Sequence, residues 1–215
     1  MNKIYFTADL HFGHTNVLKH CPDRPYACDG NIEAHDEWLL DLWRSTVDKK
    51  DDIYILGDLT FLKSDNARRL LEKLPGRKFL IEGNHDGSIR SYGNYFVSVN
   101  QILDFKFSPQ RAPVLKDNLR VTMCHYPMVT WNHKPYGGIM LHGHCHGKLD
   151  EYNSRAPDLR FDVGLDGYLA SEAGRRNGDT HGLIPLALLY EEAVLKAKTG
   201  DFDEYVSANY RSAEK

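Results

Sequence analysis

The sequence lacks any apolar run long enough to cross a membrane. The run at Ile184–Tyr190 contains Pro185, and it is far shorter than the ~20 apolar residues that a membrane-spanning helix needs. At the amino-terminal end, Asp9 and His11 interrupt the chain before a secretory apolar segment could form. We therefore expect a cytoplasmic protein with no membrane partner.

The sequence also has few cysteines and a small net charge. The four cysteines form no C-x-x-C pair, and a chain of 215 residues needs no disulfides to stabilise its core, so we expect reduced thiols. Lys and Arg number 27 against 30 Asp and Glu, which gives a net charge of −3. This balance disfavours nucleic acid as a partner, because proteins that bind it usually carry a basic stripe. A local basic groove would still allow such binding.

With 41% hydrophobic and 27% charged residues, the chain has the composition of an ordinary globular domain. Short β-rich runs alternate with helical patterns, which predicts an α/β fold. Expected strands cover 4–8, 53–56, 78–81, 95–107, 119–124, 138–142 and 159–163, expected helices cover 31–47, 64–74 and 188–198, and expected loops cover 108–118 and 171–182. We expect a single domain over residues 1–200, followed by a polar tail over 201–215.

Polar side chains follow five of the expected strands, at the point where each strand ends. In α/β sheets, ligands bind at the carboxyl ends of the strands. One polar residue of this kind would usually be a cap or a satisfied polar group. Several in equivalent places would be costly to bury without a cation to satisfy them. The candidates are Asp9, His11, Asp58, Asn84, His125, His144 and His146.

The chemistry of these side chains indicates which cations they would bind. Carboxylate, imidazole and amide donors without a thiolate suit divalent ions such as Mn²⁺, Fe²⁺, Zn²⁺ or Ni²⁺, and we take Mn²⁺ first. Two ions ~3.5–4 Å apart form the arrangement that proteins use for in-line displacement at phosphorus. One carboxylate must then bridge the two ions, and Asp58 is the natural choice.

Other polar residues belong to weaker patterns. His14 could contact a substrate phosphate or cap the next helix, and Arg24 could clamp a phosphate or lie on the surface. Asp162 and Asp166 are expected to anchor turns and loops. Of the eleven histidines, four are expected to be structural: His20, His35, His133 and His181.

Five motifs occur in a fixed order along the chain. They are D-x-H at 9–11, G-D at 57–58, G-N-H-D at 83–86, a histidine at 125 and G-H-x-H at 143–146. This order resembles the calcineurin-like metallophosphoesterase superfamily, and the match covers most of the chain. The opening segment ADLHFGHTNVLKHC, followed by Arg24-Pro25, is similar to the small bacterial and phage-borne phosphoesterases of that superfamily.

The resemblance implies a four-layer α/β/β/α sandwich and a role for each motif residue. One ion would be bound by Asp9, His11, Asp58 and His146, and the other by Asp58, Asn84, His125 and His144. A hydroxide that bridges the ions would be the nucleophile. The catalytic residues would be His85, which would protonate the leaving oxygen or stabilise the transition state, and Asp86, which would orient His85.

One position departs from the family pattern. Many members have a second aspartate three residues after the bridging one, where this chain has Phe61. Metal binding should survive this change, because that aspartate usually orients the ligands and does not itself bind the ions. The change therefore bears on how the ligands are oriented.

Three functions are compatible with the sequence. The first is a dinuclear-metal phosphoesterase that hydrolyses a small phosphomonoester or phosphodiester, such as a nucleotide. The second is a nuclease of the same superfamily that acts on DNA or RNA, which the net charge of −3 disfavours. The third is a non-catalytic scaffold with the same fold, and it ranks last because every motif residue is present.

Overall fold

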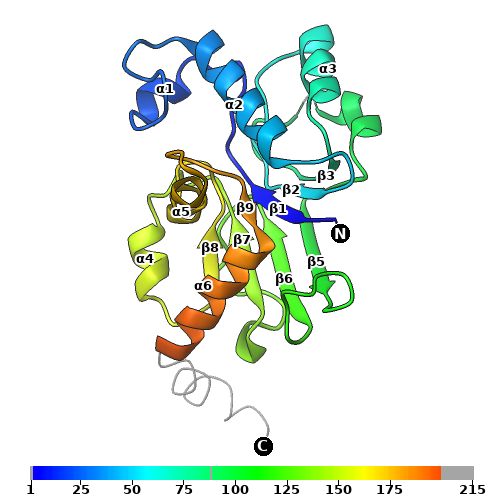
Figure 1. Cartoon of the computed structure of the whole chain (residues 1–215), viewed down its shortest axis with the longest axis vertical. Helices are drawn as coiled ribbons and strands as arrows, with labels where there is room; N and C mark the ends of the chain where they lie inside the picture. Colours follow the sequence, from blue (N-terminus) through cyan, green and yellow to red (C-terminus); the bar gives the residue numbers. More distant parts are fainter. Residues whose placement is uncertain (1, 88, 200–215) are drawn as a thin grey trace, which may run out of the picture.

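The computed structural model describes residues 2–87 and 89–199, which form two β-sheets with helices around them (Figure 1). The first sheet has the order β4-β3-β2-β1-β9, built from β1 (Ile4–Thr7), β2 (Asp52–Ile55), β3 (Arg77–Ile81), β4 (Ser98–Asn100) and β9 (Ile184–Pro185). The second has the order β5-β6-β7-β8, built from β5 (Ile102–Phe107), β6 (Leu119–Cys124), β7 (Ile139–His142) and β8 (Arg160–Asp162). The α-helices of this part of the chain are α1 (Val17–His20), α2 (Ile32–Thr46), α3 (Ser64–Lys73), α4 (Asp150–Arg155), α5 (Tyr168–Asn177) and α6 (Leu186–Thr199).

Two apolar layers hold these elements together. Successive strand residues point to opposite faces, so in β1 Tyr5 and Phe6 enter different layers. Phe6 packs between the two sheets, where its ring meets Phe107 of β5 edge-on with centroids 6.0 Å apart. Tyr5 packs with Leu39 of α2 and Leu71 of α3. The first sheet is therefore covered by helices on one face and by the second sheet on the other, which confirms the expected α/β architecture.

The parallel strands determine where the site lies. Strands β1 to β4 are parallel to one another, and β6, β7 and β8 form a second parallel set. An isolated parallel bridge pairs Ala8, just after β1, with Gly164, just after β8. The Leu165 N–H also donates to the Ala8 carbonyl at 3.1 Å. The carboxyl ends of the two parallel sets therefore meet.

The structure corrects two expectations. The alternation over 95–107 predicts one strand, but the chain bends at Gln101 and forms β4 in the first sheet and β5 in the second. The polar stretch 171–182 predicts a loop, but α5 continues to Asn177 before it ends at Gly178. Its buried face includes Gly174, where an added Cβ would lie 2.5 Å from the backbone of the following segment, so this glycine permits close packing.

Other expectations are confirmed. The predicted helices at 31–47 and 188–198 correspond to α2 and α6, and the Asn31 side chain caps α2 by accepting the Ala34 N–H at 3.0 Å. The predicted tail over 201–215 lies outside the described residues. Among the helices described, none is long and apolar enough to span a bilayer.

We predict that Trp43→Ala lowers the free energy of unfolding by ~3–5 kcal/mol, the usual effect of removing a fully buried aromatic side chain. Trp43 is 1% exposed, and its indole N–H donates to the Pro75 carbonyl at 2.9 Å. Trp38→Ala is the matched control, because Trp38 lies on the same helix and is only partly buried. Urea denaturation should show a smaller loss for the control, and equal losses would contradict this prediction.

Candidate metal centre

The seven predicted metal ligands meet where the parallel strands end. Four of them follow β1, β2 and β3 of the first sheet, and three follow β6 and β7 of the second. In chain order they are Asp9, His11, Asp58, Asn84, His125, His144 and His146. Contacts between their donor atoms join them into one cluster between the two sheets.

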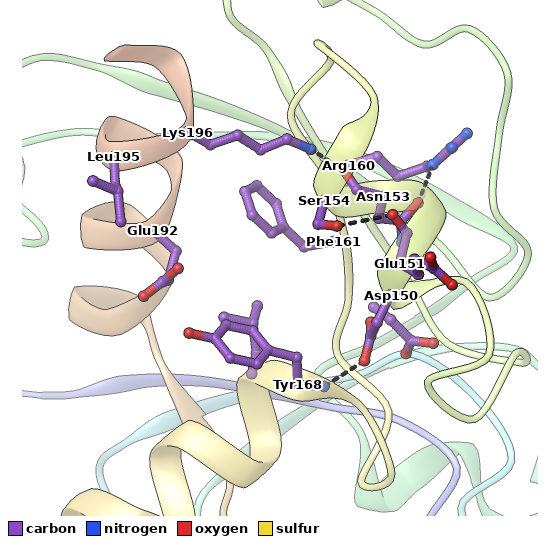
Figure 2. Close-up of a pocket in the computed structure, with 12 residues that line it drawn as sticks. Asp150, Glu151, Asn153, Ser154, Arg160, Phe161, Tyr168, Glu192, Leu195 and Lys196 are labelled. Atoms are coloured by element: carbon purple, nitrogen blue, oxygen red, sulfur yellow. Dashed lines mark hydrogen bonds between the residues drawn. The ribbon is translucent and has the colours of Figure 1, made fainter. Parts of the chain in front are cut away.

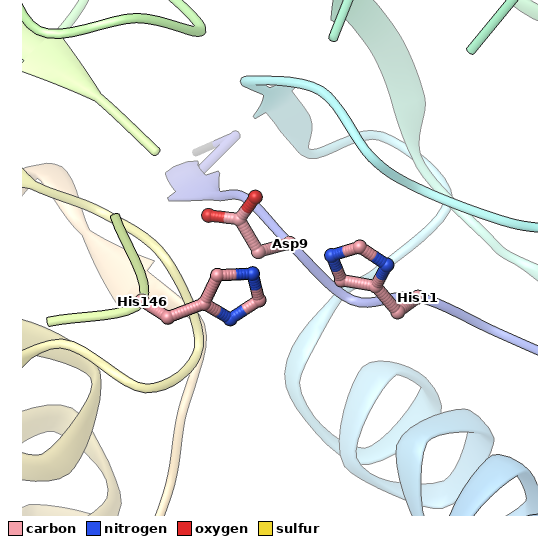
Figure 3. A group of neighbouring side chains, drawn as sticks. All are labelled: Asp9, His11 and His146. Carbon is pink, nitrogen blue, oxygen red and sulfur yellow. The ribbon is translucent and has the colours of Figure 1, made fainter. Parts of the chain in front are cut away.

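One part of the cluster consists of Asp9, His11 and His146. Figure 3 shows these side chains converging, with Asp9 and His11 on the segment that follows β1 and His146 on a loop opposite. One potential ligand atom from each lies within 4.8 Å of the others. Asp9 Oδ1 and His11 Nε2 are buried and have no hydrogen-bond partner among the described residues. A cation is the natural partner for such atoms, since buried polar atoms are otherwise hydrogen-bonded.

Asp58 stands between histidines from the two sheets. Its Oδ2 lies 3.7 Å from His11 Nε2 and 3.6 Å from His125 Nε2. His125 Nδ1 lies 2.7 Å from the Leu56 carbonyl, so Nδ1 carries a proton and Nε2, which faces the cluster, is an acceptor. The Asp58 carboxylate therefore lies between a histidine of the first sheet and a histidine of the second.

The other part of the cluster is completed by an amide and a second histidine. Asn84 Oδ1 lies 3.0 Å from His125 Nε2 and 3.1 Å from His144 Nδ1. Asn84 and His144 are exposed, whereas His125 is completely buried. The cluster is therefore enclosed on one side and open to solvent on the other.

Burial and like charge act together on the acids and bases of the cluster. Burial, followed by the nearby carboxylates of Asp162 and Asp58, raises the pKa of Asp9 well above its usual value. Burial, followed by the charge of His146, lowers the pKa of His11 to about 2. His11 is therefore a neutral imidazole, which is the form that binds metal. A divalent cation would reverse the penalty on the Asp9 carboxylate.

The backbone is strained at the predicted ligands. Seven non-glycine residues of the described chain have positive φ, and five of these are predicted ligands: Asp9, His11, Asp58, His144 and His146. This conformation costs about 1–3 kcal/mol for each such residue and is concentrated at functional sites. Gly57 also has a φ of 89°, and a Cβ there would lie 2.5 Å from His125 Nδ1, so only glycine fits.

His85 lies at the exposed rim of the cluster, with Nε2 4.0 Å from Asp58 Oδ2. The expectation that Asp86 orients this imidazole needs correction. The buried Asp86 carboxylate accepts backbone N–H groups instead, from Asp58 at 2.8 Å, Gly83 at 2.9 Å and Leu59 at 3.2 Å. Asp86 therefore holds together the two turns that carry Asp58 and His85, and it acts through the backbone.

Phe61 and His14 form an aromatic wall beside His85. The Phe61 ring stacks on His14 with centroids 3.7 Å apart and lies 4.6 Å from the His85 ring. His14 Nδ1 is also 3.2 Å from His11 Nδ1. Phe61 thus packs against both His14 and His85 beside the cluster. Direct contact of His14 with substrate stays a prediction.

Arg24 is buried, which corrects the expectation of a phosphate clamp. Its side chain is 0% exposed and pairs with Asp166, while further N–H groups reach the carbonyls of Asp9 and Leu10. Burial alone would raise the pKa of Asp166, but hydrogen bonds with Arg24 and His146 hold it well below its usual range. Arg24 is therefore part of the support of the cluster and is not presented to a substrate.

The role of Asp166 was missed by the sequence analysis, which predicts only an anchor for a turn. Asp166 Oδ2 lies 2.6 Å from His146 Nδ1. The available signal was its place just after β8, because polar residues that follow other parallel strands form the cluster. Asp162 does anchor turns as expected, since it accepts N–H groups from Gly147 and Gly164.

A separate cavity of about 440 Å³ lies between α4, β8, α5 and α6 (Figure 2). Its walls include Phe161, Tyr168 and Lys196, and the Tyr168 N–H donates to Asp150 at 2.6 Å. None of the seven predicted ligands lines this cavity. We therefore do not assign it to the chemistry of the cluster.

Comparison with known proteins agrees with this geometry. The model of the calcineurin-like phosphoesterases matches residues 2–200, and the chain belongs to that family. Family membership supports metal-dependent hydrolysis of a phosphoester.

Three known proteins are similar to this chain in sequence or in fold. The uncharacterized protein MJ1445 of Methanocaldococcus jannaschii is 33% identical over 155 residues, covering 71% of this chain and 74% of that protein. The gene 66 protein of Mycobacterium phage D29 is 32% identical over 212 residues, covering 86% and 93%. The crystal structure of AQ665, a protein of unknown function from Aquifex aeolicus, has a TM-score of 0.61 at 20% identity, covering 89% of this chain and 100% of that one. The last likeness supports the fold alone.

We predict that Gly143→Ala destabilises the protein by ~1–3 kcal/mol, the usual cost of overpacking a close contact. A Cβ at Gly143 would lie 2.5 Å from Ala8 Cβ and 2.6 Å from Asp9 Oδ2, so the turn that carries Asp9 must shift. Gly93→Ala is the control, because nothing lies within 4 Å of an added Cβ there. Thermal denaturation should separate the two variants, and a fully stable Gly143→Ala protein would argue against the close approach.

Proposed function

We propose that this protein is a phosphoesterase that uses two divalent metal ions to hydrolyse a small phosphomonoester or phosphodiester. The observation that carries the proposal is the position of Asp58 Oδ2, 3.7 Å from His11 Nε2 and 3.6 Å from His125 Nε2. A carboxylate between histidines of two sheets can bridge two ions, and paired ions promote displacement at phosphorus. Membership of the calcineurin-like phosphoesterase family supports the same chemistry.

We assign the donors to two sites that share Asp58. The first site comprises Asp9, His11, His146 and Asp58, and the second comprises Asn84, His125, His144 and Asp58. The unpartnered atoms of Asp9 and His11 and the convergence of Asn84 with two histidines support this division. All donors are nitrogen or oxygen, which favours Mn²⁺ and also suits Fe²⁺, Zn²⁺ or Ni²⁺.

His85 is the general acid of the proposed reaction. When bound, two ions neutralise charge on the phosphoryl group and lower the pKa of a water nucleophile. His85 is exposed on the open side of the cluster and can donate a proton to the leaving oxygen. Its backbone N–H donates to Asp58 Oδ1 at 2.9 Å, which ties its position to that of the bridging carboxylate.

The proposed substrate is small and the proposed compartment is the cytoplasm. The net charge of −3 disfavours an extended nucleic acid as substrate. All four cysteines are free, as expected of a protein in a reducing compartment.

Metal binding tests the proposal without any substrate. After loading with Mn²⁺ and removal of excess ion, elemental analysis should find two ions per wild-type chain. Asp58→Asn should hold markedly less metal, because the amide loses the charge that both ions share. Asp104→Asn is the control, since Asp104 lies on β5 beside Thr122, and it should retain both ions. A wild-type protein without bound transition metal would refute the proposal.

Hydrolysis tests the role of His85. We expect His85→Ala to retain metal and to hydrolyse bis-p-nitrophenyl phosphate ~10²–10⁴-fold more slowly, the usual effect of losing a general acid. His20→Ala is the control, because His20 is exposed on α1 and belongs to none of the contacts above. Full activity of His85→Ala would remove its assigned role.

The same assay defines the substrate class. The rates of hydrolysis should be compared for four substrates: p-nitrophenyl phosphate, bis-p-nitrophenyl phosphate, cyclic nucleotides and an oligonucleotide. Each substrate is assayed in the presence of Mn²⁺, Ni²⁺ or Zn²⁺. Preference for a small ester is the expected result, and preference for the oligonucleotide would establish a nuclease instead.

A further inference from the structure

Arg24 lies on the segment between α1 and α2, and its side chain is buried beside the residues of the cluster. The guanidinium binds the Asp166 carboxylate with two parallel hydrogen bonds, Nε to Oδ1 at 2.7 Å and Nη2 to Oδ2 at 2.6 Å. Its planar fork makes this paired contact possible, and lysine cannot reproduce it. The geometry therefore depends on this residue type, and a positive charge alone would not be sufficient.

Arg24 also holds the turn that follows β1. Nη2 donates to the Asp9 carbonyl at 2.6 Å, and Nη1 donates to the Leu10 carbonyl at 3.1 Å. Asp9 has a φ of 57°, a left-handed conformation that is uncommon for residues other than glycine and that persists when the surrounding structure holds it. Arg24 contacts the backbone on both sides of this turn, and the Asp9 carboxylate on the same turn lies in the cluster.

Asp166 extends the network to His146. Its Oδ2 lies 2.6 Å from His146 Nδ1. An ionised carboxylate only accepts hydrogen bonds, so Nδ1 carries a proton and Nε2 is the nitrogen that faces the cluster. Carboxylates that bind the second nitrogen of a histidine in this way orient metal ligands in many proteins.

We infer that Arg24 and Asp166 are positioning residues for one of the two metal sites, an inference that rests on the proposed function. Asp166 fixes the ring of His146, and Arg24 fixes both Asp166 and the backbone of Asp9. The donors of the other site are held differently, since His125 Nδ1 donates to the Leu56 carbonyl at 2.7 Å and neither Arg24 nor Asp166 contacts His125 in the hydrogen bonds described above. Loss of the Arg24–Asp166 pair should therefore weaken one site and spare the other.

A third cation site is the competing explanation for these contacts. Cys21, His146 and Asp166 place one potential ligand atom each within 4.8 Å of the others. The Arg24 guanidinium, however, already engages both oxygens of Asp166, and its positive charge would repel a cation there. The buried Cys21 thiol donates to Asp166 Oδ2 at 3.4 Å, so it also belongs to the hydrogen-bonded support.

Calorimetric titration of the metal-free full-length protein with Mn²⁺ tests the inference. We expect Asp166→Asn and Arg24→Lys to weaken one of the two binding steps by ~10–100-fold, the usual effect of losing a group that orients a metal ligand. The other step should be unchanged. Arg160→Lys is the matched control, because Arg160 is also buried but binds Asn153 and the Met128 carbonyl, and both of its steps should match wild type.

A double-mutant comparison identifies the affected site. His146→Ala should weaken the same step as Asp166→Asn, and adding Asp166→Asn to it should have little further effect because Asp166 acts through His146. Full additivity would contradict this route. If Arg24→Lys fails to fold by circular dichroism, the nearly isosteric Asp166→Asn variant still decides the question.

The remaining outcomes separate the inference from the proposed function. Wild-type affinity at both steps in Asp166→Asn, or equal weakening of both, would overturn the positioning role and leave the phosphoesterase proposal intact. A third binding step that disappears in Asp166→Asn would favour the competing cation site. Absence of Mn²⁺ binding by the wild-type protein would instead refute the proposed function.

Discussion

Asp9 is completely buried, and one of its carboxylate oxygens has no hydrogen-bond partner in the part of the chain that the structure describes. A charge held in that way needs compensation from an opposite charge, because leaving a carboxylate unpaired in the interior costs several kcal/mol. The nearby Asp58 and Asp162 carboxylates add to that cost. The surrounding fold keeps these acids close together. The parallel strands end side by side, and the turns that follow them direct the acidic side chains inward.

That arrangement places strained backbone conformations at the predicted metal ligands. Five of the predicted ligands have left-handed φ angles, and an added Cβ at Gly57 or Gly143 would clash with its neighbours. These features do not stabilise the fold, and strain of this kind is typical of functional sites. The apolar layers on both faces of the first sheet stabilise the fold enough to tolerate the strain. Asp86 contributes at the same place by joining the strained turn at Asp58 to the turn at Gly83 through their N–H groups.

The sequence was sufficient to predict the cluster but not the contacts that support it. All seven ligand candidates follow strands, and parallel strands bring their carboxyl ends together, so local pattern and topology led to the same residues. Arg24 and Asp166 are separated by 142 residues and meet only in the folded chain. Local pattern also does not show that the alternation over 95–107 divides between two sheets, or that Gly174 lies inside a helix because close packing requires it.

The Ala8–Gly164 bridge joins the two sheets at the base of the cluster, and the predicted ligands come from both sides of that junction. Any ion bound there would link the two sheets through its ligands, and the link would be lost when the ion dissociates. Binding to the native state alone adds about 2.7 kcal/mol of stability when free ligand exceeds its dissociation constant 100-fold. The metal concentration would then affect the free energy of unfolding as well as the occupancy of the site. The lifetime of the folded protein in a cell would therefore depend on the availability of its ions.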